Sequence, residues 1–370
     1  MFIDLIDTYD WKNTTELIYS KTDSEVQAAL QAKSRNLDDF MALISPAAEP
    51  YIEEMARQSQ QRTLRRFGKT IQLYVPLYLS NFCENNCVYC GFNTQNRIKR
   101  KVLSYEEIKD EVIAIRKLGF EHILLVTGES DVKAGAAYLK KAFEIIKPHV
   151  SLISIEVQPL QAEEYADLIE QGLNTVYLYQ ETYNRERYPV YHLGGKKRDY
   201  ENRLKTYENL GKAQVHKIGL GILAGLEDWR TDSFFTALHL NYLKRTYWRT
   251  KYSVSFPRLR PHSGSFQPNS IMTDRQLAQL IFAYRLFDEN VEIALSTRES
   301  AHYRDHMLKL GVTSMSAESK TNPGGYAHPE LNDELEQFAV NDSRTALEVA
   351  NMIRSNGYEA VWKDWDYILQ

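Results

Sequence analysis

The alternation of short apolar runs with amphipathic stretches from residue 71 onward constrains the fold more than any other feature of this sequence. Runs with strand character cover 71–79, 122–127, 150–157, 174–180, 215–222, 251–256, 291–296 and 312–317. Helical stretches lie between them, at 104–118, 135–147, 161–171, 199–212, 231–248, 274–287 and 299–310. Repeated strand–helix units imply parallel strands, in a barrel or in a large doubly wound sheet. Eight strands favour the barrel, so we predict an α/β fold of the (β/α)8 TIM type.

Two further segments flank the predicted barrel. Residues 1–70 read as helices, and residues 331–370 follow the eighth strand. We therefore predict an N-terminal helical segment (1–70), a barrel (71–330) and a C-terminal extension (331–370). In the extension, the segment Trp362-Lys-Asp-Trp365 either shields the active site from solvent or fastens the tail to the rest of the fold.

Side chains in several predicted strands divide by polarity between the two faces. In 150–158, Ser154, Glu156 and Gln158 alternate with isoleucine and valine. The ranges 217–222, 253–256 and 292–298 show the same alternation of polar or small residues with apolar ones. We expect the apolar face to meet the outer helices, which leaves the polar and small face for the lumen. Because valine, isoleucine and leucine fill the interior of an ordinary TIM barrel, a polar lumen indicates a functional site.

All three cysteines lie close together, as Cys83, Cys87 and Cys90. Structural zinc normally has four protein ligands, and no histidine precedes His122 to complete a Cys3His set nearby. A disulfide would leave one thiol over, and inert buried thiols would be scattered along the chain. Thiolates are the usual ligands of iron–sulfur clusters, so the C-x3-C-x2-C spacing favours a cluster loop. In a cubane cluster, three protein ligands leave one iron open to another molecule.

This loop resembles that of the radical S-adenosylmethionine (SAM) superfamily, in which an aromatic residue such as Tyr89 precedes the third cysteine. Other stretches narrow the resemblance, over nearly the whole chain, to the 2-iminoacetate synthases, the tyrosine lyases of thiamine biosynthesis. These stretches are Tyr74-Val-Pro-Leu-Tyr-Leu-Ser80, Gly91-Phe-Asn93, Arg97-Ile-Lys-Arg-Lys101, Leu125-Val-Thr-Gly-Glu129, Glu156-Val-Gln-Pro159, Tyr179-Gln-Glu-Thr-Tyr183, Ser253-Val-Ser-Phe-Pro-Arg-Leu-Arg-Pro261, Ser296-Thr-Arg-Glu299 and Pro323-Gly-Gly-Tyr326.

The resemblance implies a [4Fe–4S] cluster on the three cysteines, with the methionyl group of SAM on the open iron. It implies that a SAM-derived radical cleaves the Cα–Cβ bond of L-tyrosine to give 2-iminoacetate and p-cresol, with 5′-deoxyadenosine and methionine. Because the radical does the chemistry, no side chain is predicted to be catalytic. The implied partners are thiazole synthase, which uses the product, and a flavodoxin-like reductant. The basic stretch 97–101 is either a solvated surface patch or, because it lies beside the loop, a docking site for an acidic electron donor.

Candidate cofactor-binding residues lie where predicted strands end, which is where a TIM barrel carries its site. Gly128 and Glu129 follow the second strand, in the stretch that resembles the SAM-binding stretch of the family. Gly128 would let the backbone approach a ligand, and Glu129 would accept a hydrogen bond from the methionyl ammonium. Glu156 and Gln158 are candidates for ribose or amino-acid contacts, unless they satisfy each other as a buried polar pair. Tyr89 completes this set.

Candidates for binding the amino-acid substrate follow later strands. Arg298 ends the seventh strand, faces inward by strand parity and suits a bidentate pair with a carboxylate. Ser296 or Thr297 would supply a neighbouring hydroxyl. The remaining candidates are Arg258 and Arg260 after the sixth strand, and Gln180 and Glu181 after the fourth. For each arginine, a salt bridge between loops is the alternative role.

Composition excludes some classes and leaves two alternatives. A net charge of −4 argues against a general nucleic-acid-binding surface, and no apolar run has the length of a membrane span. Few cysteines and an oxygen-sensitive cluster favour the cytoplasm. One alternative is the tyrosine-cleaving maturase of [FeFe]-hydrogenase, which carries a second cluster on C-terminal cysteines, whereas this chain has none after Cys90. The other is a non-catalytic iron–sulfur electron carrier, which should use four protein ligands per cluster.

Overall fold

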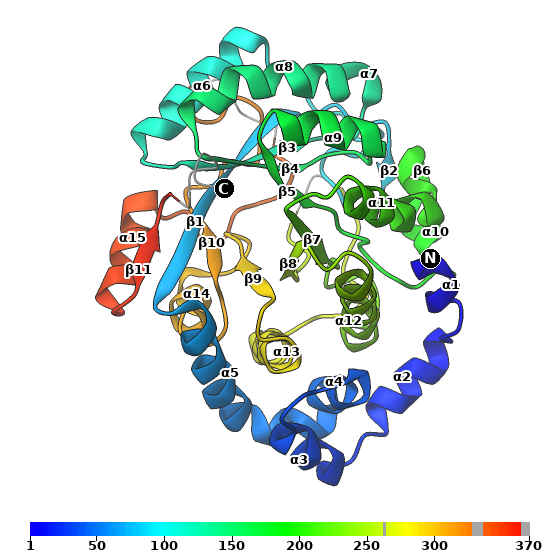
Figure 1. Cartoon of the computed structure of the whole chain (residues 1–370). Coiled ribbons are helices and arrows are strands. Elements are labelled where there is room, and N and C mark those ends of the chain that lie inside the picture. Colours follow the sequence, from blue (N-terminus) through cyan, green and yellow to red (C-terminus); the bar gives the residue numbers. More distant parts are fainter. Residues whose placement is uncertain (262–263, 328–335, 364–370) are drawn as a thin grey trace.

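A computed structural model describes residues 1–261, 264–327 and 336–363. Eight parallel strands form a closed barrel surrounded by helices, which confirms the predicted (β/α)8 fold (Figure 1). The barrel strands are β1 (Thr70–Ser80), β3 (His122–Thr127), β4 (Leu152–Glu156), β5 (Leu173–Tyr177), β7 (Lys217–Gly221), β8 (Lys251–Ser255), β9 (Glu292–Leu295) and β10 (Ser314–Ser316). Each of them lies within or overlaps a predicted strand.

Parallel pairing on both sides of β1 closes the ring. Gln72–Tyr74 of β1 pair with Ser314–Ser316 of β10, and Val75–Tyr78 pair with Ile123–Val126 of β3. Since all eight strands run in one direction, their carboxyl ends meet at a single rim. The loops that follow the strands therefore lie together at this rim, although they are far apart in the sequence.

Helices cover the outside of the barrel, with apolar stripes turned toward the strands. They are α6 (Tyr105–Lys117), α8 (Ala136–Ile146), α9 (Ala162–Glu170), α11 (Tyr200–Lys212), α12 (Trp229–Thr246), α13 (Asp274–Phe287) and α14 (Ala301–Met307). Short helical turns lie between them, namely α7 (Asp131–Ala134), α10 (Tyr188–Tyr191), η2 (Lys147–His149) and η3 (Lys196–Arg198). A further turn, η1 (Pro46–Tyr51), precedes the barrel, within the N-terminal segment. None of the helices in the described ranges is both long and apolar enough to cross a membrane.

The N-terminal helices form an arc outside α12 and α13 (Figure 1). They are α1 (Phe2–Ile6), α2 (Trp11–Tyr19), α3 (Asp23–Gln31), α4 (Leu37–Ile44) and α5 (Ile52–Phe67). Ile44 and Met55 are fully buried, and the amide of Gln279 on α13 donates to the carbonyls of Leu43 (2.9 Å) and Ser45 (2.8 Å). These contacts tie the arc to the outer helix layer.

The division between lumen and outer core follows the predicted parity. Ile153, Ile155, Ile218, Leu220, Val254, Ile293 and Leu295 belong to the outer core, while Glu156, Ser255, Ser296 and Arg298 face the lumen. Inward positions on β5 carry Tyr177, and the next inward residue is Tyr179. A methyl group on Gly219 or Gly221 of β7 would lie 2.2 Å or 2.6 Å from these rings. Glycine on β7 therefore makes room for tyrosine inside the barrel.

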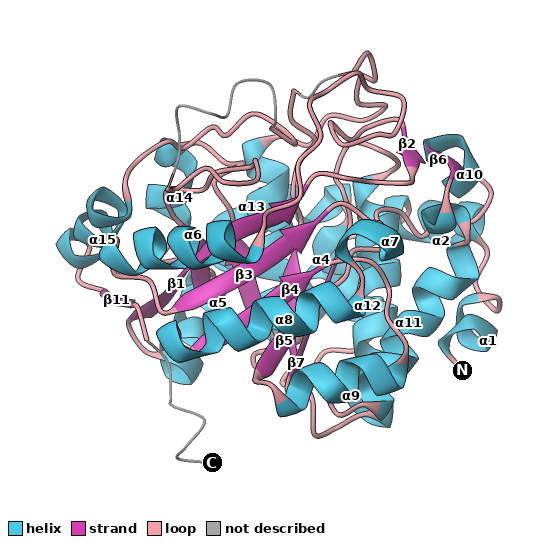
Figure 2. Ribbon diagram, turned by 90° about the horizontal axis from the view of Figure 1, so that it is seen from above, coloured by secondary structure: helices cyan, strands magenta, loops and turns pink. Residues whose placement is uncertain are grey.

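A small antiparallel pair lies above the rim and was not predicted. It joins β2 (Asn86–Cys87), within the cysteine loop, to β6 (His192–Gly194), within the long connection between β5 and α11. Figure 2 shows both strands, with α10, at one end of the molecule.

The last described part of the C-terminal extension lies at the opposite end of the barrel. After α15 (Ala346–Ser355), β11 (Glu359–Val361) pairs with Thr70–Gln72, where β1 begins. The ring of Trp362 then packs edge-on against Phe120, with centroids 5.2 Å apart. Figure 2 shows β11 far from β2 and β6. Trp362 therefore fastens the tail to the barrel and does not shield the active site, while Trp365 lies outside the described residues.

We expect Trp362→Ala to lower the free energy of unfolding by ~1–3 kcal/mol, because a half-buried indole is removed from its contact with Phe120. Thermal unfolding measures this loss. Iron content after anaerobic reconstitution should not change, since the residue is at the far end of the barrel. Trp248→Ala is the matched control, because that side chain is 73% exposed. An unchanged melting temperature with lost iron would contradict the assignment.

Candidate active site

A cavity opens in the lumen at the carboxyl ends of the strands. Side chains from most of the barrel strands and from the loops behind them line it, among them Tyr78, Tyr179 and Arg203. The predicted site residues that face it are Cys83, Cys87, Tyr89, Cys90, Gly128, Glu129, Glu156, Glu181, Arg260, Ser296, Thr297 and Arg298. Because TIM-barrel enzymes carry their active sites at this end, we take the cavity as the candidate active site.

Hydrogen bonds to backbone carbonyls hold the cysteine loop in place. The guanidinium of Arg100 donates to the carbonyls of Asn81 (2.7 Å), Phe92 (2.8 Å) and Asn93 (2.7 Å). The Asn93 amide in turn donates to the carbonyl of Cys87 (2.9 Å). Arg100 belongs to the basic stretch 97–101, and these bonds make it a structural brace of the loop.

The β2–β6 pair orients Tyr89. His192 Nδ1 lies 2.9 Å from the carbonyl oxygen of Tyr188, which can only accept, so Nδ1 carries the proton. Nε2 then accepts a hydrogen bond from the Tyr89 hydroxyl at 2.7 Å. Burial lowers the pKa of His192 to about 2, which keeps the imidazole neutral and this arrangement intact.

The three thiols fit an iron–sulfur cluster. All three cysteines are free of disulfides and line the same cavity. No three His, Cys, Asp or Glu side chains in the described ranges converge closely enough for one metal ion. A cluster of several irons spreads its ligands further apart than a single ion does. Burial raises the pKa of the Cys83 thiol to about 11 and raises those of Cys87 and Cys90, so metal binding would release protons.

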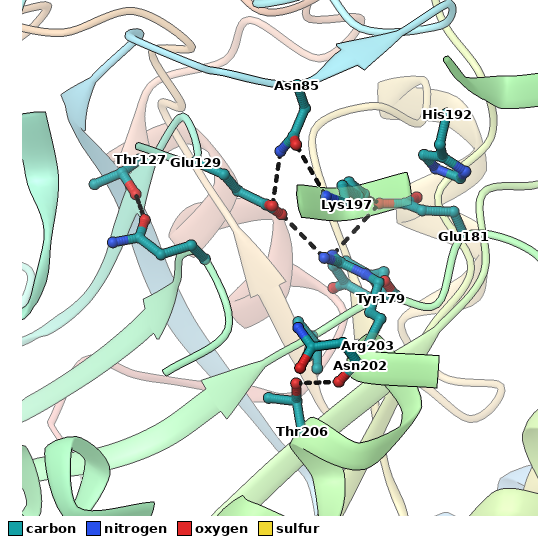
Figure 3. A network of polar contacts seen from close by, with 12 residues as sticks. Asn85, Thr127, Glu129, Tyr179, Glu181, His192, Lys197, Asn202, Arg203 and Thr206 are labelled. Atoms are coloured by element: carbon teal, nitrogen blue, oxygen red, sulfur yellow. Dashed lines mark hydrogen bonds and ion pairs between the residues drawn. The ribbon is translucent and has the colours of Figure 1, made fainter. Parts of the chain in front are cut away.

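A network of alternating charges lies beside the cysteine loop (Figure 3). Arg203 on α11 donates to Glu129 at 3.0 Å, and the Asn85 amide donates to the other oxygen of Glu129 at 2.8 Å. Lys197 forms an ion pair with Glu181 at 2.7 Å. The backbone N–H of Lys197 also donates to Asn85 Oδ1 at 2.9 Å.

The positive groups keep the Glu129 carboxylate ionised. Burial on its own would raise the pKa of Glu129, but Arg203 and Lys197 hold it below its ordinary value. Glu181 adopts a left-handed backbone conformation with φ of 70°, which is uncommon for a residue other than glycine. This conformation places its carboxylate at the network. The arrangement offers both a carboxylate and a cation to a zwitterionic ligand.

Nearby positive charges compensate Glu156 less fully than Glu129. Its carboxyl group faces the cavity, and burial together with nearby Glu181 raises its pKa to about 7, despite the opposing charges of Arg298, Lys197 and Arg203. A carboxyl group with this pKa can hold or release a proton near neutral pH.

Arg298 has a free guanidinium edge. Its guanidinium lies 3.4 Å from the ring centroid of Phe338. In the described part of the chain, no carboxylate lies within ion-pair distance of Arg298, so its hydrogen-bond donors remain available. The backbone of neighbouring Thr297 binds the C-terminal extension, because its carbonyl oxygen accepts hydrogen bonds from the N–H groups of Asn341 (3.0 Å) and Asp342 (3.1 Å).

Three candidate residues lie outside the cavity. Arg258 forms salt bridges with Glu299 and with Asp274 (2.7 Å), which is the alternative role predicted for it. Arg260 does line the cavity, but it also forms a salt bridge with Glu299 (3.0 Å). Gln158 is bound to Thr127 (3.3 Å) and to the carbonyl of Ala134. Gln180 is buried, because alternation along the strand turns it away from the inward residues on either side.

Sequence reasoning missed several cavity residues, namely Tyr78, Asn85, Tyr179, Lys197, Arg203, Gln337 and Phe338. The inward tyrosines share the period of two used for Glu156 and were detectable from it. Lys197 lies in the connection between β5 and α11, outside any predicted strand. Arg203 reaches the site from a helix, and Gln337 and Phe338 come from the extension, so strand parity says nothing about them.

We predict that Glu156→Gln stabilises the apo protein at alkaline pH. The folded state keeps a proton up to about pH 7, whereas the unfolded chain loses it near the ordinary value of 4.5. Wild-type stability therefore falls as pH rises through this window. The variant should exceed wild type by up to ~3 kcal/mol at pH 8, and the difference should vanish toward pH 4.5. Urea unfolding of the iron-free, reduced proteins measures it.

Glu53→Gln, at an exposed position, controls for the loss of a carboxylate as such. A pH-independent difference between Glu156→Gln and wild type would contradict the buried, protonated carboxyl group.

Known proteins resemble this chain in both sequence and structure. Residues 77–235 match the Radical SAM superfamily, and residues 255–359 match the Biotin and Thiamin Synthesis associated domain. The 2-iminoacetate synthase of Escherichia coli (strain K12) is 49% identical over 363 residues, which are 97% of this chain and 95% of that protein.

Two crystal structures of HydG, a maturase of the [FeFe]-hydrogenase, have the same fold. One superposes with a TM-score of 0.89 at 27% identity and covers 95% of this chain and 79% of its own. HydG from Carboxydothermus hydrogenoformans superposes with a TM-score of 0.88 at 30% identity, and the match covers 97% of this chain and 84% of that protein. The near-complete match at 49% identity, together with three cysteines on the rim of a barrel, decides the family. The chain belongs to the 2-iminoacetate synthase family of the Radical SAM superfamily.

Proposed function

We propose that this protein cleaves the Cα–Cβ bond of L-tyrosine to 2-iminoacetate and p-cresol, with SAM converted to 5′-deoxyadenosine and methionine. The observation that carries the proposal is the 49% identity to a 2-iminoacetate synthase over 97% of the chain. Atoms and charges balance when one turnover takes up two electrons and one proton. When bound, the cluster and SAM supply the first electron transfer and the radical, and the protein supplies binding and orientation.

Cys83, Cys87 and Cys90 would hold the cluster, which leaves the fourth iron for SAM. The charge network beside the loop suits the methionyl group, since Glu129 or Glu181 can accept from an ammonium and Lys197 or Arg203 can donate to a carboxylate. Tyr89, fixed by His192, would lie against the cofactor. Glu156 faces the same space and is placed for a ribose contact.

Arg298 would hold the tyrosine carboxylate. Stacking on Phe338 fixes the plane of its guanidinium, while the edge that carries the donors stays available for a bidentate pair. Ser296 and Thr297 flank it, and Arg260 lines the same cavity. The aromatic rings of Tyr78 and Tyr179 line the cavity beside the cysteine loop and would keep water from the reacting carbon atoms.

Two alternatives have less support. A HydG-like maturase would need ligands for a second cluster, and the three cysteines of this chain all lie in one loop. An electron carrier would not need a cavity lined by Arg298 and by a charge network. Both alternatives are tested by the product analysis below.

We also infer two partners, a thiazole synthase that takes up 2-iminoacetate and an acidic, flavodoxin-like one-electron donor. The match to the Biotin and Thiamin Synthesis associated domain supports the first. Arg97 and Lys99, exposed beside the cysteine loop, support the second. An oxygen-sensitive cluster supports a cytoplasmic location.

Anaerobic incubation with SAM, dithionite and L-tyrosine tests the function. We expect 5′-deoxyadenosine and p-cresol in equal amounts, quantified by chromatography. Cys87→Ala should release neither product, because one cluster ligand is lost. Formation of 5′-deoxyadenosine without p-cresol would leave a radical SAM enzyme with another substrate, and formation of neither would favour the electron carrier.

Arg298→Lys should weaken tyrosine binding by ~10-fold or more, because an ammonium cannot reproduce the planar fork of a guanidinium. Isothermal titration with tyrosine, in the presence of SAM, measures this change. Affinity for SAM should stay within about twofold of wild type. Arg258→Lys serves as the matched control, since that guanidinium is engaged by Glu299 outside the cavity. Equal losses for SAM and tyrosine would remove Arg298 from the substrate site.

A further inference from the structure

Residues 336–342, which we call the strap, cross the rim of the barrel beside the cysteine loop. Three backbone hydrogen bonds hold the strap against other loops. The N–H groups of Gln337, Ala339 and Asn341 donate to the carbonyl oxygens of Thr321 (2.9 Å), Pro261 (3.0 Å) and Thr297 (3.0 Å), respectively. Glycine at position 91 lets the strap come close, because a Cβ atom there would lie 2.4 Å from the carbonyl oxygen of Gln337. The strap therefore has a fixed position next to Cys90.

The side chain of Gln337 joins two groups of the site. Its Nε2 lies 3.8 Å from Cys90 Sγ, and its Oε1 accepts a hydrogen bond from the Tyr78 hydroxyl at 2.8 Å. A thiolate has no proton and can only accept, so the amide nitrogen must face the sulfur once Cys90 is a cluster ligand. The hydroxyl of Tyr78 then donates to the amide oxygen and fixes this orientation.

We propose that Gln337 raises the reduction potential of the cluster by donating a hydrogen bond to Cys90, with Tyr78 as a positioning residue for the amide. The inference rests on the proposed function only in that it requires the cluster. Reduction adds negative charge to the cluster and its sulfur ligands. A hydrogen bond to a ligand sulfur is stronger in the reduced state and so favours reduction.

The surroundings of this contact make it effective. Tyr78 and Phe92 lie beside it and are buried, with 5% and 1% of their surfaces exposed, whereas Cys90 and Gln337 are partly exposed to the cavity. A bound cluster would cover that side, so little water would then compete for the sulfur. The nearby backbone N–H of Phe92 also favours the ionised form of Cys90 by lowering its pKa, against the effect of burial. The loop therefore supplies one donor of its own, and the C-terminal extension supplies the second.

The test compares midpoint potentials of reconstituted full-length proteins, measured by redox titration monitored by electron paramagnetic resonance, with and without SAM. In Gln337→Leu, the ratio of reduced to oxidised cluster at the wild-type midpoint should fall roughly tenfold. For a one-electron couple this is a midpoint about 59 mV more negative. Gln95→Leu, an exposed glutamine near the same loop, is the matched control and should leave the midpoint unchanged.

Tyr78→Phe keeps the amide but removes the hydroxyl that orients it, so a smaller shift in the same direction is expected. Unchanged midpoints in both variants would overturn the proposal, as would loss of iron from Gln337→Leu while the remaining clusters titrate as in wild type. If Gln337→Leu cannot be loaded, the midpoint of Tyr78→Phe decides alone. The titration uses no tyrosine, so failure to form p-cresol would reject the proposed substrate and leave this result standing.

Discussion

The parallel pairing of β1 with β3 on one side and with β10 on the other is the constraint on which the site depends. The ladder with β3 continues past the strand ends, where Gly128 N–H donates to the Ser80 carbonyl (2.8 Å) and Glu84 N–H donates to the Glu129 carbonyl (2.9 Å). These bonds fix the cysteine loop against the carboxylate of Glu129. A Cβ atom at position 128 would lie 2.2 Å from the carbonyl oxygen of Phe82, so this close approach requires glycine.

Four buried charges beside the loop are stable only as a set. Removing Arg203 would leave Glu129 and Glu181 with one cation between them, and an unpaired buried charge is strongly destabilising. A zwitterionic ligand could bind to the same network. Its ammonium would take the place of a cation beside Glu129 or Glu181, and its carboxylate would take the place of a carboxylate beside Lys197 or Arg203. The residues that stabilise one another in this network are therefore also the ones that we propose bind the amino-acid group.

The sequence allowed the barrel and one half of the site to be predicted. Strand parity is a local rule, so it placed Glu156 and Arg298 in the lumen correctly. It stops at the strand ends, where the backbone is no longer pleated, and Arg258 turned instead to Glu299. Lys197 and Gln337 reach the site through contacts between distant segments, which no local pattern encodes. Arg100 was misread because a run of basic residues says nothing about the carbonyls that one of them braces.

The two ends of the barrel divide stability from chemistry. At the amino ends of the strands, Lys217 pairs with Glu292 at 2.6 Å, and buried His122, with its pKa lowered to about 3 by burial and by Lys217, bonds to Ser154. These polar groups pair with one another at the amino ends of the strands and do not line the cavity. At the carboxyl ends, by contrast, Arg298 and the cysteine thiols keep unused bonding capacity facing the cavity. The extension serves both ends, since β11 lengthens the sheet beside β1 and the strap reaches Cys90. One chain terminus thus couples the stability of the barrel to the environment of the cluster.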